Sequence, residues 1–384
     1  MPHRRRHVLT GLLALAASPL AASPATEEKL RAIMQASAAR PPDAERLRER
    51  EALLREAEAA LAAGNAHKAE QGFDRAALIL HSADTEMGLV RSYMQAGQYR
   101  RALAFGAHTA GAHLDAVGGA ALYAWLLHAG GQDAIARKLL ADAQARAPSQ
   151  PLVAGVGRAL ASGAPHASGD MLLPPARLAP YSHAALLPNG ARLVATGTLL
   201  GEGRAALVPA QAIAASRRLW VRNGLGQLAP ASAEPGRTGE RALALLRLGS
   251  PLPAPSLGSV PASAFPGAVA FAVAYAHTSD AGAAWPLLRT GFVGAARGAD
   301  GDRELDASLH QGLAPGGPVF DQAGRLAGIA LADSTGARLL AAPRLREAFA
   351  GRVALPTSSE AARLGPDAVY EAALRSTLQV IAAR

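Results

Sequence analysis

Three glycine-containing turns recur at nearly equal spacing in the first half of the chain. Gly64-Asn65, Gly97-Gln98 and Gly131-Gln132 lie 33 and 34 residues apart within a segment, 28–162, that is dominated by Ala, Leu, Arg and Glu. Five residues beyond each glycine stands an alanine: Ala69, Ala102 and Ala136. A repeat of this length predicts stacked helical hairpins, in which the small alanines let the two helices of each pair approach closely.

Further positions within these units follow a known repeat. Phe73 and Ala76 belong to the first unit, Tyr93 and Tyr99 suit the second, and Leu140, Ala143 and Pro148 belong to the third. The pattern resembles the tetratricopeptide repeat, although Gly106 stands where the second unit would have an aromatic residue. The resemblance implies a helical array over 26–162 that binds a protein or peptide partner on its concave face. The alternative is an irregular helical domain whose glycine turns are spaced by chance.

A different pattern begins after a loop-like linker at 163–180. The expected strands are short and are separated by Gly- and Pro-containing turns, as in a barrel or sandwich. They are Arg192–Leu200, Leu219–Arg222, Ala242–Leu248, Ala268–Tyr275, Leu287–Ala296 and Arg325–Leu331. Asn223-Gly224 adds a strong hairpin signal.

One run in this β region is more specific than the rest. Gly316-Gly317-Pro318-Val319-Phe320-Asp321, followed by Gly324 and by Gly328-Ile329, resembles the nucleophile loop of trypsin-like serine proteases of the bacterial HtrA kind. The resemblance covers roughly 176–350 and implies two packed six-stranded barrels, with a domain at 181–352. The fold class is therefore multidomain α + β, a helical array followed by an all-β double barrel. The alternative is an unrelated antiparallel β domain, since such domains can also contain these turns.

The residues that such a protease needs are missing at the matching positions. Pro315 stands where the serine would be, and proline offers neither a hydroxyl nor a backbone N–H. Gln211 takes the place of the histidine and cannot accept a proton near neutral pH, and Ala242 takes the place of the aspartate. Leu313 and Ala314 replace the usual oxyanion-loop residues. Counting instead from Asp306-Ala307 moves the serine position to Ala314, which is no nucleophile either.

The N-terminus has the features of a secretory signal, predicted over 1–25. Arg4–Arg6 precede the apolar stretch Val8–Ala17, and the small residues in Leu20–Ala25 suit cleavage. A periplasmic or secreted protein is expected, exported by the Sec route or, from the arginines, by a twin-arginine route. No later run reaches 18 apolar residues, so no stable membrane span is expected in the mature form.

Composition restricts the function classes further. The chain has 384 residues, which suggests two or three domains, and no cysteine, which excludes disulfides and a thiol nucleophile. The net charge of +9 is scattered and only 4% of residues are aromatic, so nucleic-acid binding is not expected. No cofactor fingerprint is present. Oligomeric state cannot be read from the sequence.

The C-terminal segment 353–384 is expected to carry a helix over Pro366–Ala383 that docks on the barrels. Its apolar side chains fall on one helical face: Val369, Ala373, Leu374, Leu378 and Ile381.

The remaining polar residues give no strong site. His108 and His113 are five apart on a predicted helix, which is poor spacing for one metal ion, so no metal site is predicted. His277 with Asp280 lacks a third ligand. Ser308 and His310 could approach the substituted site as a relocated pair, but Pro315 argues against an oxyanion hole beside them.

The function predicted from these residues is that of an exported, non-catalytic protein-binding or scaffold protein. One alternative is an active trypsin-like serine endopeptidase that uses unconventional residues. Another is a regulator of a different envelope protease.

Overall fold

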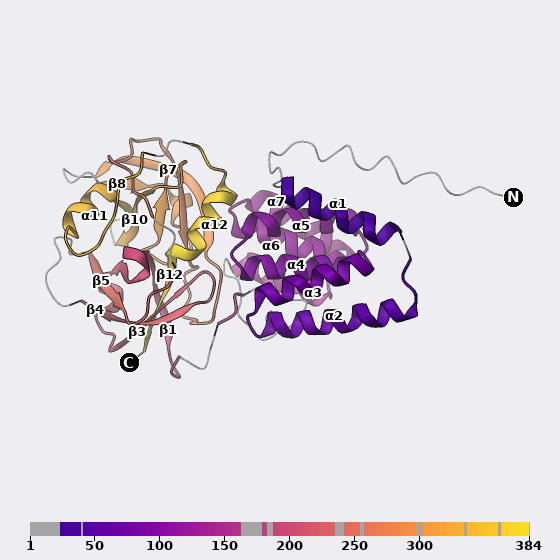
Figure 1. The fold of residues 1–384 in the computed structure, drawn as a ribbon. Coiled ribbons are helices and arrows are strands. Elements are labelled where there is room, and N and C mark those ends of the chain that lie inside the picture. The colour runs from indigo at the N-terminus through magenta and orange to yellow at the C-terminus, as the bar shows by residue number, and fades with distance from the viewer. Residues whose placement is uncertain are drawn as a thin grey trace.

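The computed structural model describes residues 24–39, 41–162, 179–182, 187–234, 242–253, 257–297, 302–333, 336–359 and 362–383. Most of the predicted signal segment and of the predicted linker at 163–180 lies outside these ranges. The described chain forms a helical array followed by two β-barrels, which lie side by side (Figure 1). None of the helices in the described ranges combines the length and the apolar content that a bilayer span needs.

The array consists of eight helices. They are α1 (Pro24–Ala39), α2 (Ala44–Ala62), α3 (Ala66–Ile79), α4 (Ala83–Gln95), α5 (Tyr99–Ala112), α6 (Val117–Ala129), α7 (Asp133–Arg146) and α8 (Pro151–Ser162). The predicted turns at Gly64, Gly97 and Gly131 separate α2 from α3, α4 from α5 and α6 from α7.

The three turns share one hydrogen-bond pattern. Each glycine has a positive φ, between 73° and 82°. In the second turn, the Gly97 N–H donates to the Met94 carbonyl (3.0 Å) and the Gln98 N–H donates to the Tyr93 carbonyl (2.8 Å), and the same two bonds recur in the others. This is the Schellman helix ending, which favours glycine because it requires the left-handed conformation.

The predicted alanines lie where the paired helices meet. Ala69, Ala102 and Ala136 are fully buried, as are Phe73, Ala76 and Ala143. The 33–34-residue repeat therefore corresponds to a repeated helical hairpin. At its N-terminal end, α1 is held to α3 and α4 by Lys29, whose ammonium group donates to Asp74 (2.7 Å), Glu70 (3.1 Å) and Tyr93 (2.9 Å).

The β region forms two closed barrels of six strands each. The first has the order β1-β12-β3-β4-β5-β2 and the second the order β10-β11-β8-β7-β6-β9, with every strand pair antiparallel. The first-barrel strands are β1 (Arg192–Leu200), β2 (Ala205–Pro209), β3 (Arg218–Asn223), β4 (Leu228–Ala233), β5 (Leu243–Leu248) and β12 (Thr377–Ala383). The second-barrel strands are β6 (Val269–Ala274), β7 (Leu287–Arg297), β8 (Asp302–Leu305), β9 (Pro318–Phe320), β10 (Leu326–Asp333) and β11 (Gly336–Ala341). The double barrel expected from the sequence is confirmed.

All six strands predicted from the sequence are present, within a few residues of their predicted ends. Six more were not predicted: β2, β4, β8, β9, β11 and β12. Several of these are short, and β4 contains Pro230, so their sequences have little of the alternation that identifies a strand.

The C-terminal prediction is wrong in part. The helix expected over 366–383 ends early, as α12 (Pro366–Ser376), and Thr377–Ala383 forms β12. The strand lies between β1 and β3, so it pairs on both sides and closes the first barrel. All seven of its residues are buried, which removes the polar–apolar alternation of a half-exposed strand. The barrel domain therefore does not end at 352 but includes the last described residues of the chain.

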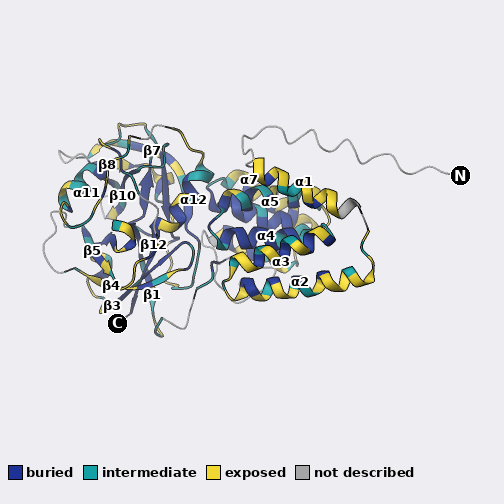
Figure 2. Cartoon of the chain, viewed as in Figure 1, coloured by how far each residue is buried: buried dark blue, intermediate teal, exposed yellow. Residues whose placement is uncertain are grey.

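Helix α12 lies between the array and the barrels, and the three share one apolar core (Figures 1 and 2). The rings of Tyr99 and Tyr370 meet edge to face with centroids 4.5 Å apart, and those of Trp125 and Trp285 lie 5.0 Å apart. The Tyr370 hydroxyl donates to the Pro286 carbonyl (2.7 Å). The array and the barrels are thus joined by packed aromatic side chains.

The three glycine turns lie along this junction. A Cβ on Gly131 would come within 2.9 Å of the Leu288 carbonyl oxygen, one on Gly97 would meet Leu225, and one on Gly64 would collide with Tyr181. Each glycine is therefore favoured by its positive φ, and at Gly131 a Cβ would in addition meet backbone of the barrel domain. This edge of the array is covered by the chain itself.

We predict that Gly131→Ala destabilises the protein more than Gly190→Ala. Both glycines have a similar positive φ, +82° and +78°, so both variants incur the roughly 1–2 kcal/mol cost of a left-handed L-residue. Only the Gly131 methyl would meet Leu288, because Gly190 has nothing within 4 Å. Denaturant unfolding of the two variants measures the difference. Equal losses would show that the junction can relax to accept the methyl group.

Candidate functional site

The loop at 310–317 lies where the two barrels meet. It follows the short helix η3 (Ala307–Leu309) and leads into β9. The Thr196 N–H of β1 donates to the Pro315 carbonyl (2.9 Å), and the Thr198 hydroxyl donates to the Gly316 carbonyl (3.3 Å). Gly316 has a φ of +99°, and a Cβ there would collide with the Thr196 carbonyl oxygen. The loop is therefore fixed against the first barrel.

The backbone N–H groups of residues 313–316 in this loop already donate to carbonyls of the chain. Leu313 donates to the His310 carbonyl (3.0 Å) and Ala314 donates to the Tyr275 carbonyl (2.7 Å). Gly316 donates to the Ala330 carbonyl (2.7 Å), and Pro315 has no N–H to offer. An oxyanion hole needs donors that point together at the developing charge. Across residues 313–316, every N–H instead points at a carbonyl of the chain.

Gln211 and Ala242 are brought to the same region. Gln211 is exposed on the one-turn helix α10 (Ala210–Ile213), and the Ala210 N–H donates to the Ala242 carbonyl (2.9 Å). Pro209 packs against Gly316, which connects this pair to the loop. Gln211, Ala242 and Pro315 stand at the triad positions of the protease resemblance. The three segments that carry them therefore lie close together in space.

Ser308 and His310 do not form a nucleophile–base pair. The Ser308 hydroxyl donates to the Asp306 carboxylate, and the Ser308 N–H donates to the same oxygen (2.9 Å). These two hydrogen bonds hold the pKa of the exposed Asp306 carboxyl below its usual value. Within the described ranges no hydrogen bond joins Ser308 to His310. The hydroxyl is thus committed to a helix cap, with Asp306 as the capping residue.

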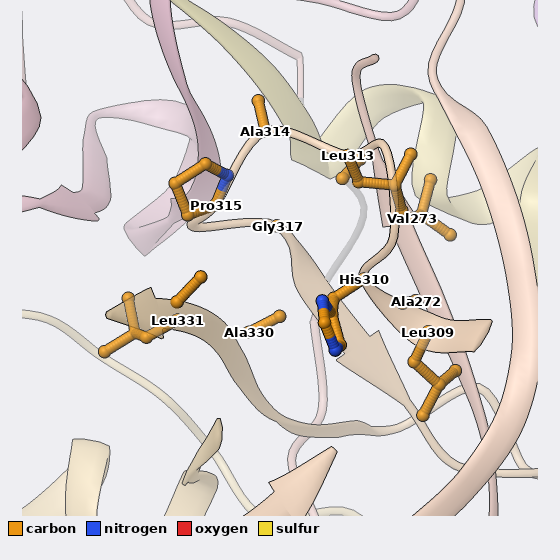
Figure 3. A pocket seen from close by; sticks show the side chains of 12 residues that line it. Ala272, Val273, Leu309, His310, Leu313, Ala314, Pro315, Gly317, Ala330 and Leu331 are labelled. Carbon is orange, nitrogen blue, oxygen red and sulfur yellow. The ribbon is translucent and has the colours of Figure 1, made fainter. Parts of the chain in front are cut away.

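The pocket beside the loop is small and apolar. Apart from His310, its lining residues have no polar side chain, and they come from β6, β10, the end of η3 and the loop (Figure 3). Its volume is about 20 Å³. That is room for about one water molecule, since a site must offer at least roughly 10–15 Å³ to hold one. A peptide side chain does not fit there without rearrangement.

Among the residues that the structure describes, the His277–Asp280 pair gains no third ligand. The Asp280 carboxylate accepts the Gly282 N–H (2.8 Å), and His277 is exposed.

The structure brings His108 and His113 close together, which their five-residue spacing did not predict. Both imidazoles lie near the Glu86 carboxylate, as does His81. The helical-spacing argument fails because His113 is the residue that ends α5, with a non-helical φ of −114° and ψ of 64°. The available signal was the pair of five-residue spacings His81…Glu86 and His108…His113, in two segments that the repeat places side by side.

Comparison with known proteins identifies no family. No protein-family model matches the chain, and no curated protein matches it. Solved structures do resemble it. The protease domain of MamO from Magnetospirillum magneticum is 22% identical over 42% of this chain and 90% of that one, with a TM-score of 0.33.

Two further structures are similar to the same extent. A serine endoprotease from Yersinia pestis is 18% identical over 44% of this chain and 58% of that one (TM-score 0.33). The HtrA-type protease AlgW, solved with a tripeptide, is 20% identical over 41% and 56% (TM-score 0.34). These serine protease domains are similar to the chain at low identity, and the two closed six-stranded barrels are established by the strand pairing described above.

Proposed function

We propose that this chain is an exported, non-catalytic protein-binding protein, a pseudoprotease that uses a tetratricopeptide-like array to bind its partner. The observation that carries the proposal is the state of the 313–316 loop. It offers neither a nucleophile nor a free backbone donor, because Leu313, Ala314 and Gly316 donate to chain carbonyls and position 315 is proline. Export is inferred from the sequence of residues 1–25.

In this proposal Gln211, Ala242 and Pro315 are degenerate triad positions, and Leu313 and Ala314 belong to a degenerate oxyanion loop. Their meeting in space supports the assignment. The alternative of an active endopeptidase with unconventional residues is disfavoured by Ser308, whose hydroxyl is bonded to Asp306, and by the small volume of the neighbouring pocket.

The array offers a surface that the barrels leave free. Its glycine-turn edge is covered, but an open groove of about 380 Å³ lies between α2 and α3. The groove is lined by Leu53, Glu56 and Ala57 of α2 and by Lys68, Gln71, Gly72, Asp74 and Arg75 of α3. Figure 2 shows exposed residues along both helices. The proposal places the partner in this groove.

Crosslinking capture with the full mature chain tests the assignment. We expect a reproducible partner set from the cell envelope that is lost with Lys68→Glu plus Arg75→Glu, two exposed cations of the groove. The matched control is Lys138→Glu plus Arg158→Glu, one exposed lysine and one exposed arginine on α7 and α8. If both double variants lose the partner set, or if neither does, the partner contacts another part of the protein. Capture of one active envelope protease would favour the regulator alternative.

We predict that restoring the triad residues does not restore an efficient protease. In the variant Gln211→His, Ala242→Asp, Pro315→Ser, the new position 315 regains an N–H, but the Leu313 and Ala314 donors remain bonded to His310 and Tyr275. Removing even one oxyanion donor costs about 10²–10³ in kcat. Turnover of peptide and ester substrates is the measurement. Activity close to that of an ordinary trypsin-like enzyme would show that the loop rearranges readily.

A further inference from the structure

Four potential metal ligands converge at the boundary between two helical hairpins of the array. Glu86 lies near the start of α4, and His81 precedes that helix. His108 is on α5, and His113 ends it. The four ligand atoms all lie within 4.8 Å of one another. The cluster is in the array, away from the substituted loop at 313–316.

The spacing of these atoms matches a four-coordinate ion. The Nε2 atoms of His81 and His108 are 3.4 Å apart. Glu86 Oε1 lies 2.6 Å from His81 Nε2 and 3.2 Å from His108 Nε2, and Glu86 Oε2 lies 3.5 Å from His113 Nε2. Ligands about 2.0–2.1 Å from a tetrahedral Zn²⁺ lie about 3.4 Å from each other. With Glu86 Oε1 as the ligand atom, the His81–His108 and Glu86–His108 separations agree with that value to within a few tenths of an ångström, whereas the 2.6 Å Glu86–His81 contact is shorter.

The Glu86 carboxylate is buried and is oriented by a neighbouring hydroxyl, as metal-binding carboxylates commonly are. The Glu86 side chain is 1% exposed, and the Thr109 hydroxyl lies 2.7 Å from Glu86 Oε2. Metal-binding carboxylates are commonly oriented by such a second hydrogen bond.

One imidazole nitrogen of the cluster is available to bind an ion. His113 Nε2 is buried and has no hydrogen-bond partner. Without an ion, one buried carboxylate therefore faces three ring nitrogens, one of which is unsatisfied. All three rings are partly exposed, between 15% and 20%, which leaves a path from solvent.

We propose that His81, Glu86, His108 and His113 bind one Zn²⁺ ion in a tetrahedral site that fastens the α3–α4 connection to the end of α5. Three imidazoles and one carboxylate suit zinc, whereas Ca²⁺ and Mg²⁺ require more oxygen ligands and Cu²⁺ favours a tetragonal arrangement. Four protein ligands leave no open position, so the ion stabilises the array and does not catalyse. The inference is independent of the proposed pseudoprotease function.

Calorimetric titration of the chelator-treated full mature chain with Zn²⁺ tests the site. We expect one ion per chain and a rise in melting temperature on binding. His108→Ala should weaken binding more than about 100-fold, since loss of a second hydrogen-bonding partner alone costs 10–100-fold. Thr109→Val should show that smaller effect. His277→Ala, an exposed histidine outside the cluster, should change nothing.

Cobalt substitution reports the geometry. Co²⁺ in the wild-type protein should give the intense visible absorption of a tetrahedral complex, and His108→Ala should lose it. His81→Ala provides a second ligand variant should His108→Ala fail the circular dichroism check for folding. Absence of saturable Zn²⁺ binding by the wild type would overturn the proposal. So would binding that both folded ligand variants retain, or Co²⁺ absorption of the weak octahedral kind.

Discussion

A chain that ends at Ser376 is expected to be unable to fold. The truncation removes β12, whose Leu378, Val380 and Ile381 are fully buried in the first barrel. Burial of each such side chain contributes about 1.5–3 kcal/mol, and a whole domain is stable by only about 5–15 kcal/mol. The loss also leaves β1 and β3 as unpaired edges, which invite aggregation.

Solubility and circular dichroism of the truncated chain measure this effect, with a chain ending at Ala383 as the control. A synthetic peptide of residues 377–384, added during refolding, should restore soluble protein by supplying the missing strand, whereas a scrambled peptide should not. A truncated chain that stays soluble and melts at the wild-type temperature would contradict the role given to β12.

Trp285→Ala is expected to lower the free energy of unfolding by about 3–5 kcal/mol, the usual cost of deleting a buried aromatic ring. Trp285 is 2% exposed and packs on Trp125 of α6, so it connects the barrels to the array. The matched control is Trp220→Ala on β3, since Trp220 is only half-buried and lies away from the shared core. Denaturant unfolding followed by circular dichroism gives both values.

A double-mutant cycle shows whether the two rings act together. Trp125→Ala combined with Trp285→Ala should cost less than the sum of the single variants, by about 0.5–3 kcal/mol, because each single change already removes the shared contact. Strict additivity, or a Trp285→Ala effect no larger than that of Trp220→Ala, would show that the array and the barrels are not coupled through this pair.

The sequence predicted those parts of the fold that local patterns determine. Gly64, Gly97 and Gly131 marked the helical hairpins because a Schellman ending requires a left-handed residue. Six strands were found from their apolar runs. The seven residues of β12 were assigned to a helix because Leu378 and Ile381 also continue the apolar face of α12. Their strand conformation depends on pairing with β1 and β3, which are distant in sequence.

The substituted loop and the histidine cluster also differ in how much of each could be predicted from the sequence. Pro315 and Gln211 could be singled out from the sequence because the loop motif identifies their positions residue by residue. The bonded state of the Leu313 and Ala314 N–H groups could not, since their acceptors include Tyr275, which follows β6 and is distant in sequence. The His81–Glu86–His108–His113 cluster was missed because its residues come from two hairpins. His113 joins the cluster because α5 ends at this residue and its backbone is no longer helical.

Labelling with a fluorophosphonate probe tests the central claim, that the protease-like domain lacks a working nucleophile. The measurement uses the purified mature chain, with an active trypsin-like enzyme as the positive control and Ser308→Ala as the negative control. The loop at 310–317 contains no serine, and the neighbouring Ser308 hydroxyl donates to Asp306 and not to His310. We therefore predict no covalent adduct by mass spectrometry while the positive control reacts to completion. A stoichiometric adduct on the wild-type chain that Ser308→Ala abolishes would contradict the account and identify an active hydrolase.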